Sequence, residues 1–100
     1  MSSKHTPGPW VIVRGDEWTT DIATVDGELP DGRPAHWNVA SVNKRRDEWE
    51  DNRRLVAAAP DLLAALVLLT ENVEHAFPGL SGLGPIAQAR AAIAKATGSA

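Results

Sequence analysis

The sequence contains no cysteine and no excess of basic residues. Without cysteine there can be no disulfide framework, no thiolate metal site, no cysteine nucleophile and no redox switch. The 10 Lys and Arg residues stand against 13 Asp and Glu residues, so the formal net charge is −3. Duplex nucleic acid is usually bound by a basic surface, which this composition does not supply. We therefore expect no duplex nucleic acid among the partners.

Long apolar runs are also missing. The longest one, residues 62–69, has eight residues, whereas a membrane span needs about 20. No apolar run follows the first five residues, so this start does not have the pattern of a signal peptide. We expect a cytoplasmic protein without a membrane segment.

The residues that are present suit one small domain built from two different halves. The chain has 100 residues, of which 43% are hydrophobic, and this is enough for a core. All four Trp lie in residues 1–50, and 13 of the 16 Ala lie in residues 51–100. We predict a single domain over residues 1–100, with strands and turns in residues 1–46 and helices in residues 47–98.

Three segments of the first half have the composition of strands. Residues 9–14 are rich in aromatic and β-branched side chains, residues 18–25 alternate in polarity, and residues 37–42 form a third candidate. Turn residues separate them, including Asp26-Gly27 and residues 30–32. We predict a three-stranded antiparallel sheet, with two or three of the Trp side chains filling its core and with Trp37, Val39 and Ser41 on one face of the third strand.

The second half predicts two or three helices, which makes the fold class α+β. Pro60 lies inside the helical pattern, and proline is tolerated at a first turn but not in a helix interior. We therefore expect one helix over residues 47–58, a break or kink, and a longer helix over residues 60–75. Pro85 favours a last helix over residues 86–97, with Gly98 as its C-terminal cap.

The longer helix predicts a second copy of the chain as a partner. Leu62, Leu66, Leu69 and Val73 recur at spacings of three and four, which places them on one helix face. Other leucines fall on the remaining faces, and a helix that is apolar nearly all round must be covered on several sides. We expect a homo-oligomer, most simply a twofold dimer, whose interface contains these four residues.

A basic and aromatic cluster is the sharpest candidate binding site. Arg45, Trp49 and Arg53 are four residues apart and would share one face of a helix that begins early. Together with Arg46 they could hold a phosphate through guanidinium groups and stack a base on the indole. Four acids alternate with these cations, so a solvated surface of ion pairs explains the pattern as well: Asp47, Glu48, Glu50 and Asp51.

No catalytic or metal signature accompanies this cluster. His5, His36 and His75 lack the spacing of metal ligands. The glycine-rich residues 79–84 precede a helix but lack the order of a phosphate-binding loop. We expect no metal, no cofactor and no catalytic residue, and hence a protein that is not an enzyme.

Two motifs resemble those of a widespread set of small tailed-phage and prophage proteins. His5-Thr6-Pro7-Gly8-Pro9-Trp10 resembles the start of that set, and the Ala-Ala-Ala-Pro-Asp-Leu-Leu run of residues 57–63 resembles its helical motif. The prolines restrict the chain and Trp10 can anchor the first strand, so we interpret His5, Pro7, Gly8, Pro9 and Trp10 as structural.

The resemblance implies a phage origin and action in the bacterial cytoplasm, without an established activity. By analogy with small acidic phage accessory proteins, we expect a non-enzymatic protein that counters host defence, either by sequestering a small nucleotide signal or by blocking a host defence protein. The alternatives are a structural or regulatory phage interaction protein without a defence role, and a small hydrolase of a nucleotide signal.

Overall fold

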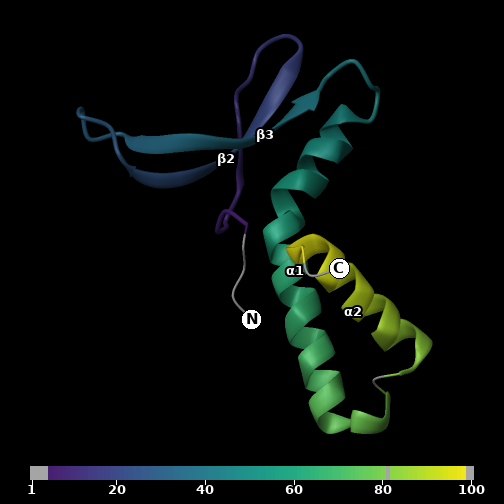
Figure 1. Cartoon of the computed structure of the whole chain (residues 1–100). Coiled ribbons are helices and arrows are strands. Elements are labelled where there is room, and N and C mark those ends of the chain that lie inside the picture. The colour runs from purple at the N-terminus through teal and green to yellow at the C-terminus, as the bar shows by residue number, and fades with distance from the viewer. Residues whose placement is uncertain (1–4, 81, 99–100) are drawn as a thin grey trace. The chain divides into compact units, whose positions relative to one another are not determined.

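The computed structural model describes residues 5–80 and 82–98. Its elements are β1 (Val11–Val13), β2 (Thr19–Glu28), β3 (Pro34–Asn43), α1 (Trp49–Ala76), the short 3₁₀ helix η1 (Pro78–Leu80) and α2 (Gly84–Thr97) (Figure 1). The α+β class, with a three-stranded antiparallel sheet followed by helices, is confirmed. The chain divides into two compact units, one of Thr6–Pro60 and one of Met1–His5 with Asp61–Ala100.

The three strands pair in sequence order. β1 pairs with β2 and β2 with β3, both antiparallel, and the register places Thr19 opposite Asn43. The turn expected at Asp26-Gly27 is wrong: Gly27 lies within β2 at φ 83°, where the pairing with β3 shifts. Glycine accepts this conformation without a steric penalty. Asp26 and Gly27 therefore form an irregularity within the β2–β3 pairing and do not end the strand. The other predicted turn, at residues 30–32, is confirmed: the chain reverses there, and the backbone N–H of Leu29 donates to the carbonyl of Arg33 at 2.7 Å.

Aliphatic side chains and a threonine, and not tryptophans, form the core of this sheet. Thr20, Ile22, Ala23 and Ala35 are its buried residues. The expectation that two or three Trp fill the core is wrong, since Trp18 and Trp37 remain 55% and 61% exposed and the other two are half-buried.

The alternation expected for the third strand also fails, because the β2–β3 register shifts between Ile22 and Ala23. Ile22 faces Ala40, and Ala23 faces Asn38, so Val39 is the extra residue. An extra residue reverses the in-and-out order along a strand. Trp37 pairs with Thr24 and Ser41 pairs with Asp21, so Trp37 and Ser41 lie on opposite faces of β3 and not on one face.

Helix α1 is longer than expected because it runs through Pro60. The sequence predicts a break there, but one helix extends from Trp49 to Ala76 with the proline inside it. Proline has no backbone N–H, so one hydrogen bond of the helix is lost. Pro60 is buried and packs on Gly8, where a Cβ would lie 3.1 Å from both Cβ and Cγ of the proline ring. This packing offsets the local cost of the proline.

Helix α2 lies back along the second part of α1 (Figure 1). It begins at Gly84, two residues before the expected start, with Pro85 in its first turn, and the expected cap is confirmed: Gly98 has φ 74° and its N–H donates to the carbonyl of Ala94. Arg90 of α2 forms an ion pair with Glu74 of α1, and this carboxylate raises the pKa of Arg90. The buried residues of the two helices in this unit are Thr70, Ile93 and Thr97.

Much of the apolar surface of α1 is open. Only 6% of its most apolar stretch is buried inside the protein, and by length and composition alone this helix could cross a membrane. Of the four residues expected at an oligomer interface, Leu62 and Leu69 are exposed, while Leu66 and Val73 are half-buried.

Candidate functional site

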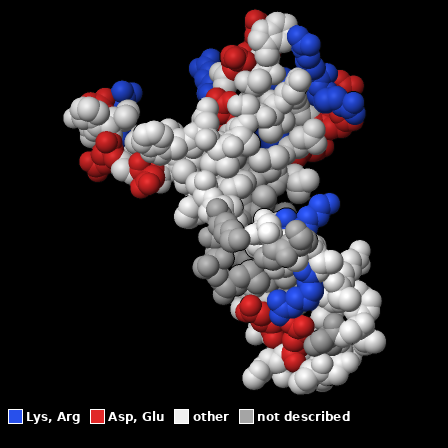
Figure 2. Space-filling view, in the orientation of Figure 1, with Lys and Arg blue, Asp and Glu red and all other residues white. Residues whose placement is uncertain are grey.

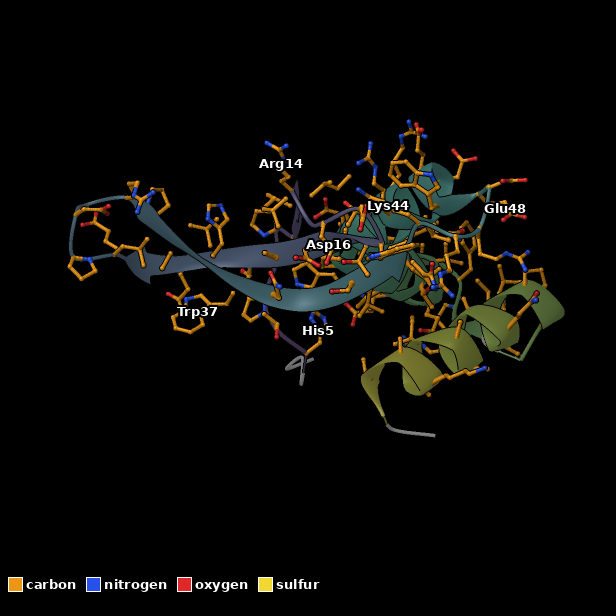
Figure 3. The ribbon with its side chains drawn as sticks, turned by 90° about the horizontal axis from the view of Figure 1, so that it is seen from above. His5, Arg14, Asp16, Trp37, Lys44 and Glu48 are labelled. Atoms are coloured by element: carbon orange, nitrogen blue, oxygen red, sulfur yellow. The ribbon has the colours of Figure 1, made fainter. Side chains whose placement is uncertain are left out.

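The candidate site lies where β3 ends and α1 begins. The pairing of β2 with β3 brings Lys44 beside Trp18, whose carbonyl accepts the backbone N–H of Lys44 at 2.8 Å. The ammonium group of Lys44 donates to the carbonyl of Asp16 at 2.7 Å. Figure 3 shows Lys44, Asp16 and Glu48 at this end of the sheet, with Trp37 well away from them on the β2–β3 hairpin. The strand register therefore positions Lys44 against the turn between β1 and β2.

Three cations lie over two indole rings at this site. The guanidinium of Arg53 is 4.9 Å from the ring centre of Trp49, and Nζ of Lys44 is 5.3 Å from the same ring. The guanidinium of Arg45 is 5.1 Å from the ring centre of Trp18. Distances below about 6 Å allow attraction between a cation and the aromatic face. We call these five residues the Arg/Trp cluster.

The neighbouring cations are neutralised by acids. Arg46 pairs with Glu48 at 3.3 Å, and Arg54 pairs with Asp51 at 2.8 Å and with Glu50 at 3.7 Å. Figure 2 shows blue and red side chains interleaved at the start of α1. These pairs agree with the ion-pair interpretation for Arg46 and for its neighbour on α1, Arg54.

Arg45 and Arg53 differ from these paired cations. Within the described residues neither forms an ion pair, and Nε of Arg53 is buried without a hydrogen-bond partner. A guanidinium carries five N–H donors in a fixed fork, which suits carboxylate or phosphate oxygens. The cluster thus holds two guanidinium groups with unused donor capacity.

The acids around the cluster are held in the ionised form. Oδ1 of Asp16 accepts the backbone N–H groups of Trp18 and Thr19, both at 2.8 Å, and these bonds lower its pKa. The guanidinium of Arg46 lowers the pKa of Glu48 in the same way. A carboxylate whose pKa is lowered is a poorer base at neutral pH.

The structure brings together only part of the predicted face. Because α1 begins at Trp49, Trp49 and Arg53 lie on it one turn apart, whereas Arg45 and Arg46 lie in the turn before it. Arg45 and Trp49 therefore do not share a helical face, and Arg45 contacts Trp18 instead. Sequence reasoning missed Lys44 and Trp18, which are brought together by the pairing of β3 with β2, the strands that they adjoin.

The N-terminal motif contacts the sheet and the helical motif. The carbonyl of Pro7 accepts the hydroxyl of Thr24 at 3.3 Å, and the indole N–H of Trp10 donates to the carbonyl of Thr6 at 3.1 Å. Gly8 packs on Pro60, so the two motifs touch each other within the unit of Thr6–Pro60. These contacts hold the N-terminal segment against β2 and α1, which is compatible with the interpretation of the motif as structural.

The remaining candidates are two histidines and the glycine-rich stretch. His36 lies in β3 and His75 in the last turn of α1, and no group of three potential metal ligands occurs among the described residues. In the glycine-rich stretch, Ser81 lies outside the described residues, and Leu83 donates its N–H to the carbonyl of Leu80 at 2.9 Å.

Comparison with known proteins identifies a phage family. A family model described as Salmonella phage P22 protein Y8K6 matches residues 1–100, the whole chain. No curated protein and no solved structure matches the chain. The phage origin that the two motifs imply is therefore confirmed at the level of the family. The chain belongs to the family of the Salmonella phage P22 protein Y8K6.

Proposed function

We propose that this phage protein is a non-enzymatic accessory protein that binds a small, phosphate-bearing nucleotide in the host cytoplasm through the Arg/Trp cluster. The observation that carries the proposal is the state of Arg45 and Arg53. Each guanidinium lies over an indole ring and forms no ion pair within the described residues, while Arg46 and Arg54 beside them are paired with acids.

The stacked guanidinium groups suit phosphate recognition. An arginine that already lies on an indole has lost part of its conformational freedom, so less entropy is lost when it binds an anion. Trp18 keeps about half of its surface exposed, which leaves indole area for a base to stack.

Binding without turnover fits the chemistry of the cluster. Its residues are cations and indoles, which are suited to holding a phosphate. The carboxylates beside them, Asp16 and Glu48, have lowered pKa values and accept hydrogen bonds from the backbone and from Arg46. They are therefore weak candidates for a general base. We infer sequestration of a nucleotide signal used by a host defence system, in preference to its hydrolysis.

The test is native mass spectrometry and calorimetry of the whole chain with a panel of linear and cyclic nucleotides and inorganic phosphate. Arg45→Ala and Arg53→Ala should each weaken binding at least about tenfold, because a charge-assisted hydrogen bond contributes about 1.5–3 kcal/mol. Arg54→Ala is the matched control, since Arg54 is next to Arg53 but paired with Glu50 and Asp51. Its affinity should stay close to that of the wild type.

Two results contradict this function. The first is a panel in which nothing binds, and the second is unchanged affinity in Arg45→Ala and Arg53→Ala. A nucleotide that is converted to product would show the alternative, a small hydrolase.

A second candidate is the blocking of a host protein by the β2–β3 hairpin. Near its tip the hairpin exposes Val25, Leu29 and Trp37 together with three acids, Asp26, Glu28 and Asp31. The indole N–H of Trp37 donates to the carbonyl of Asp26 at 2.9 Å, which holds this large side chain across the hairpin. Exposed tryptophan is typical of interaction hot spots. Capture of one host protein by the wild type and its loss in Trp37→Ala would support this function.

A further inference from the structure

We propose that α1 packs against α1 of a second copy of the chain, with the two helices antiparallel. The surface is a strip of alternating large and small side chains, Leu55, Ala58, Leu62, Ala65 and Leu69, which we call the Leu/Ala strip. The three leucines are 63%, 53% and 62% exposed, and Ala65 is also exposed. The proposal is independent of nucleotide binding.

The spacing of the Leu/Ala strip is that of a coiled-coil seam. Its leucines recur every seven residues and each alanine follows a leucine by three, which are the a and d positions of a heptad. Residues at these positions lie along one side of a helix and pack into a facing helix. Leu66 and Val73, the other two residues of the expected interface, border this strip and are half-buried.

The alternation of sizes makes the strip complementary to itself. In an antiparallel pair, Leu62 would lie opposite the partner's Ala65, and Leu69 opposite the partner's Ala58. Each large side chain then fills the space left by a small one, as close packing requires. A parallel pair would place leucine against leucine and alanine against alanine, which leaves gaps at the alanine levels.

The charges beside the strip are compatible with the same arrangement. In the antiparallel register, Asp61 lies beside the partner's Leu68 and not beside another acid. A parallel pair would place Asp61 beside the partner's Leu66, and Glu71 lies off the seam in either direction. The sizes of the side chains, and not the charges, therefore favour the antiparallel pair.

The same two acids argue against a lipid bilayer as the cover. Asp61 and Glu71 interrupt the apolar surface of α1, and both would fall within a span of about 20 residues. Charged side chains in the hydrocarbon region are costly unless they find a partner there. A second protein helix leaves both acids in water.

The length of the strip sets the strength of the dimer. Its 15 residues, 55–69, extend over about 22 Å, and a strip about 10 Å wide along that length covers roughly 220 Å² per helix. Two such strips bury less than the roughly 1,200 Å² at the lower limit of stable interfaces. We therefore expect a dimer that dissociates on dilution.

The test compares two alanine positions that follow each other on α1. Ala65 lies in the strip, and Ala64 is exposed but turned away by about 100°. Sedimentation equilibrium from about 1 µM to about 300 µM should show the mass of the wild type and of Ala64→Lys rising from one to two chains. Ala65→Lys should remain a monomer with an unchanged circular dichroism spectrum.

Cross-linking tests the direction of the helices, because the chain has no cysteine of its own. A mixture of Leu69→Cys and Ala58→Cys chains should form the mixed disulfide several times faster than either variant cross-links with itself. Preferential self-cross-linking of either variant would indicate a parallel pair and overturn the proposal. A monomeric wild type at the highest concentration, equal dimerisation of the two Lys variants, or flotation of the wild type with lipid vesicles would overturn it as well.

Discussion

Among single residues, Asp16 shows how one carboxylate organises the edge of the candidate site. Its side chain accepts the backbone N–H groups of Trp18 and Thr19, and its own carbonyl accepts Nζ of Lys44. Asp16 thus holds the turn between β1 and β2 and positions two members of the Arg/Trp cluster, Trp18 and Lys44. The two backbone hydrogen bonds also lower the pKa of Asp16 from its ordinary value of 3.8.

The lowered pKa predicts a pH dependence of stability. Since the fold favours the ionised carboxylate, its contribution is complete above pH 3.8 and is lost as the pH falls through the lower pKa of the folded state. Urea midpoints followed by Trp fluorescence from about pH 5 to about pH 2 should therefore fall more steeply for the wild type than for Asp16→Asn. Glu17→Gln, in the same turn, should keep the wild-type slope. Parallel curves for the wild type and Asp16→Asn would contradict the prediction.

At the scale of elements, helix ends follow local rules and helix interiors do not. α2 begins with Pro85 in its first turn and ends at Gly98 in the left-handed conformation, as the sequence predicts. α1 continues through Pro60, the strongest local signal for a helix end, because the proline ring is buried against Gly8. A packing contact from outside the helix therefore outweighs a local preference within it.

The cap of α2 gives a prediction at this scale. Gly98→Ala forces an alanine into a backbone conformation with φ 74°, which should lower the free energy of unfolding by about 1 kcal/mol. Gly84→Ala is the control, because Gly84 lies at the opposite end of α2 and a Cβ there meets nothing within 4 Å. It should leave stability unchanged or slightly raised. Chemical denaturation followed by circular dichroism measures both variants, and equal effects would refute the role of the cap.

At the scale of the whole molecule, each compact unit has its own buried residues. Ile22, Ala23 and Ala35 are buried in the unit of Thr6–Pro60, while Thr70 and Ile93 are buried in the unit that contains α2. The sequence-based prediction of one domain over residues 1–100, divided near residue 46, stays a prediction. The boundary between the units falls within α1, at Pro60.

Two separate cores predict two unfolding transitions. All four Trp lie in the unit of Thr6–Pro60, so their fluorescence reports on that unit, while the helical circular dichroism signal comes mainly from the other. In a urea titration at low micromolar concentration, the two signals should have different midpoints and shallow slopes, with m values on the order of 1 kcal/mol/M. Coincident curves would instead show one cooperative domain.

The candidate site shows how far sequence reasoning reaches. Trp49 and Arg53 are four residues apart on one helix, so their contact follows from helical spacing alone. The contact of Arg45 with Trp18 joins residues 27 positions apart. It depends on the register of β2 with β3, which includes a shift that no local pattern announces. This is why Lys44 and Trp18 were missed.

The sequence by itself determined the α+β class, the order of three strands before the helices, and the ends of α2, because these depend on residues that are neighbours along the chain. The tertiary structure alone decided that α1 continues through Pro60, that β2 continues through Asp26-Gly27, and that Arg45 lies over Trp18. Each of these depends on contacts between distant segments, where burial and strand register outweigh the preferences of single residues.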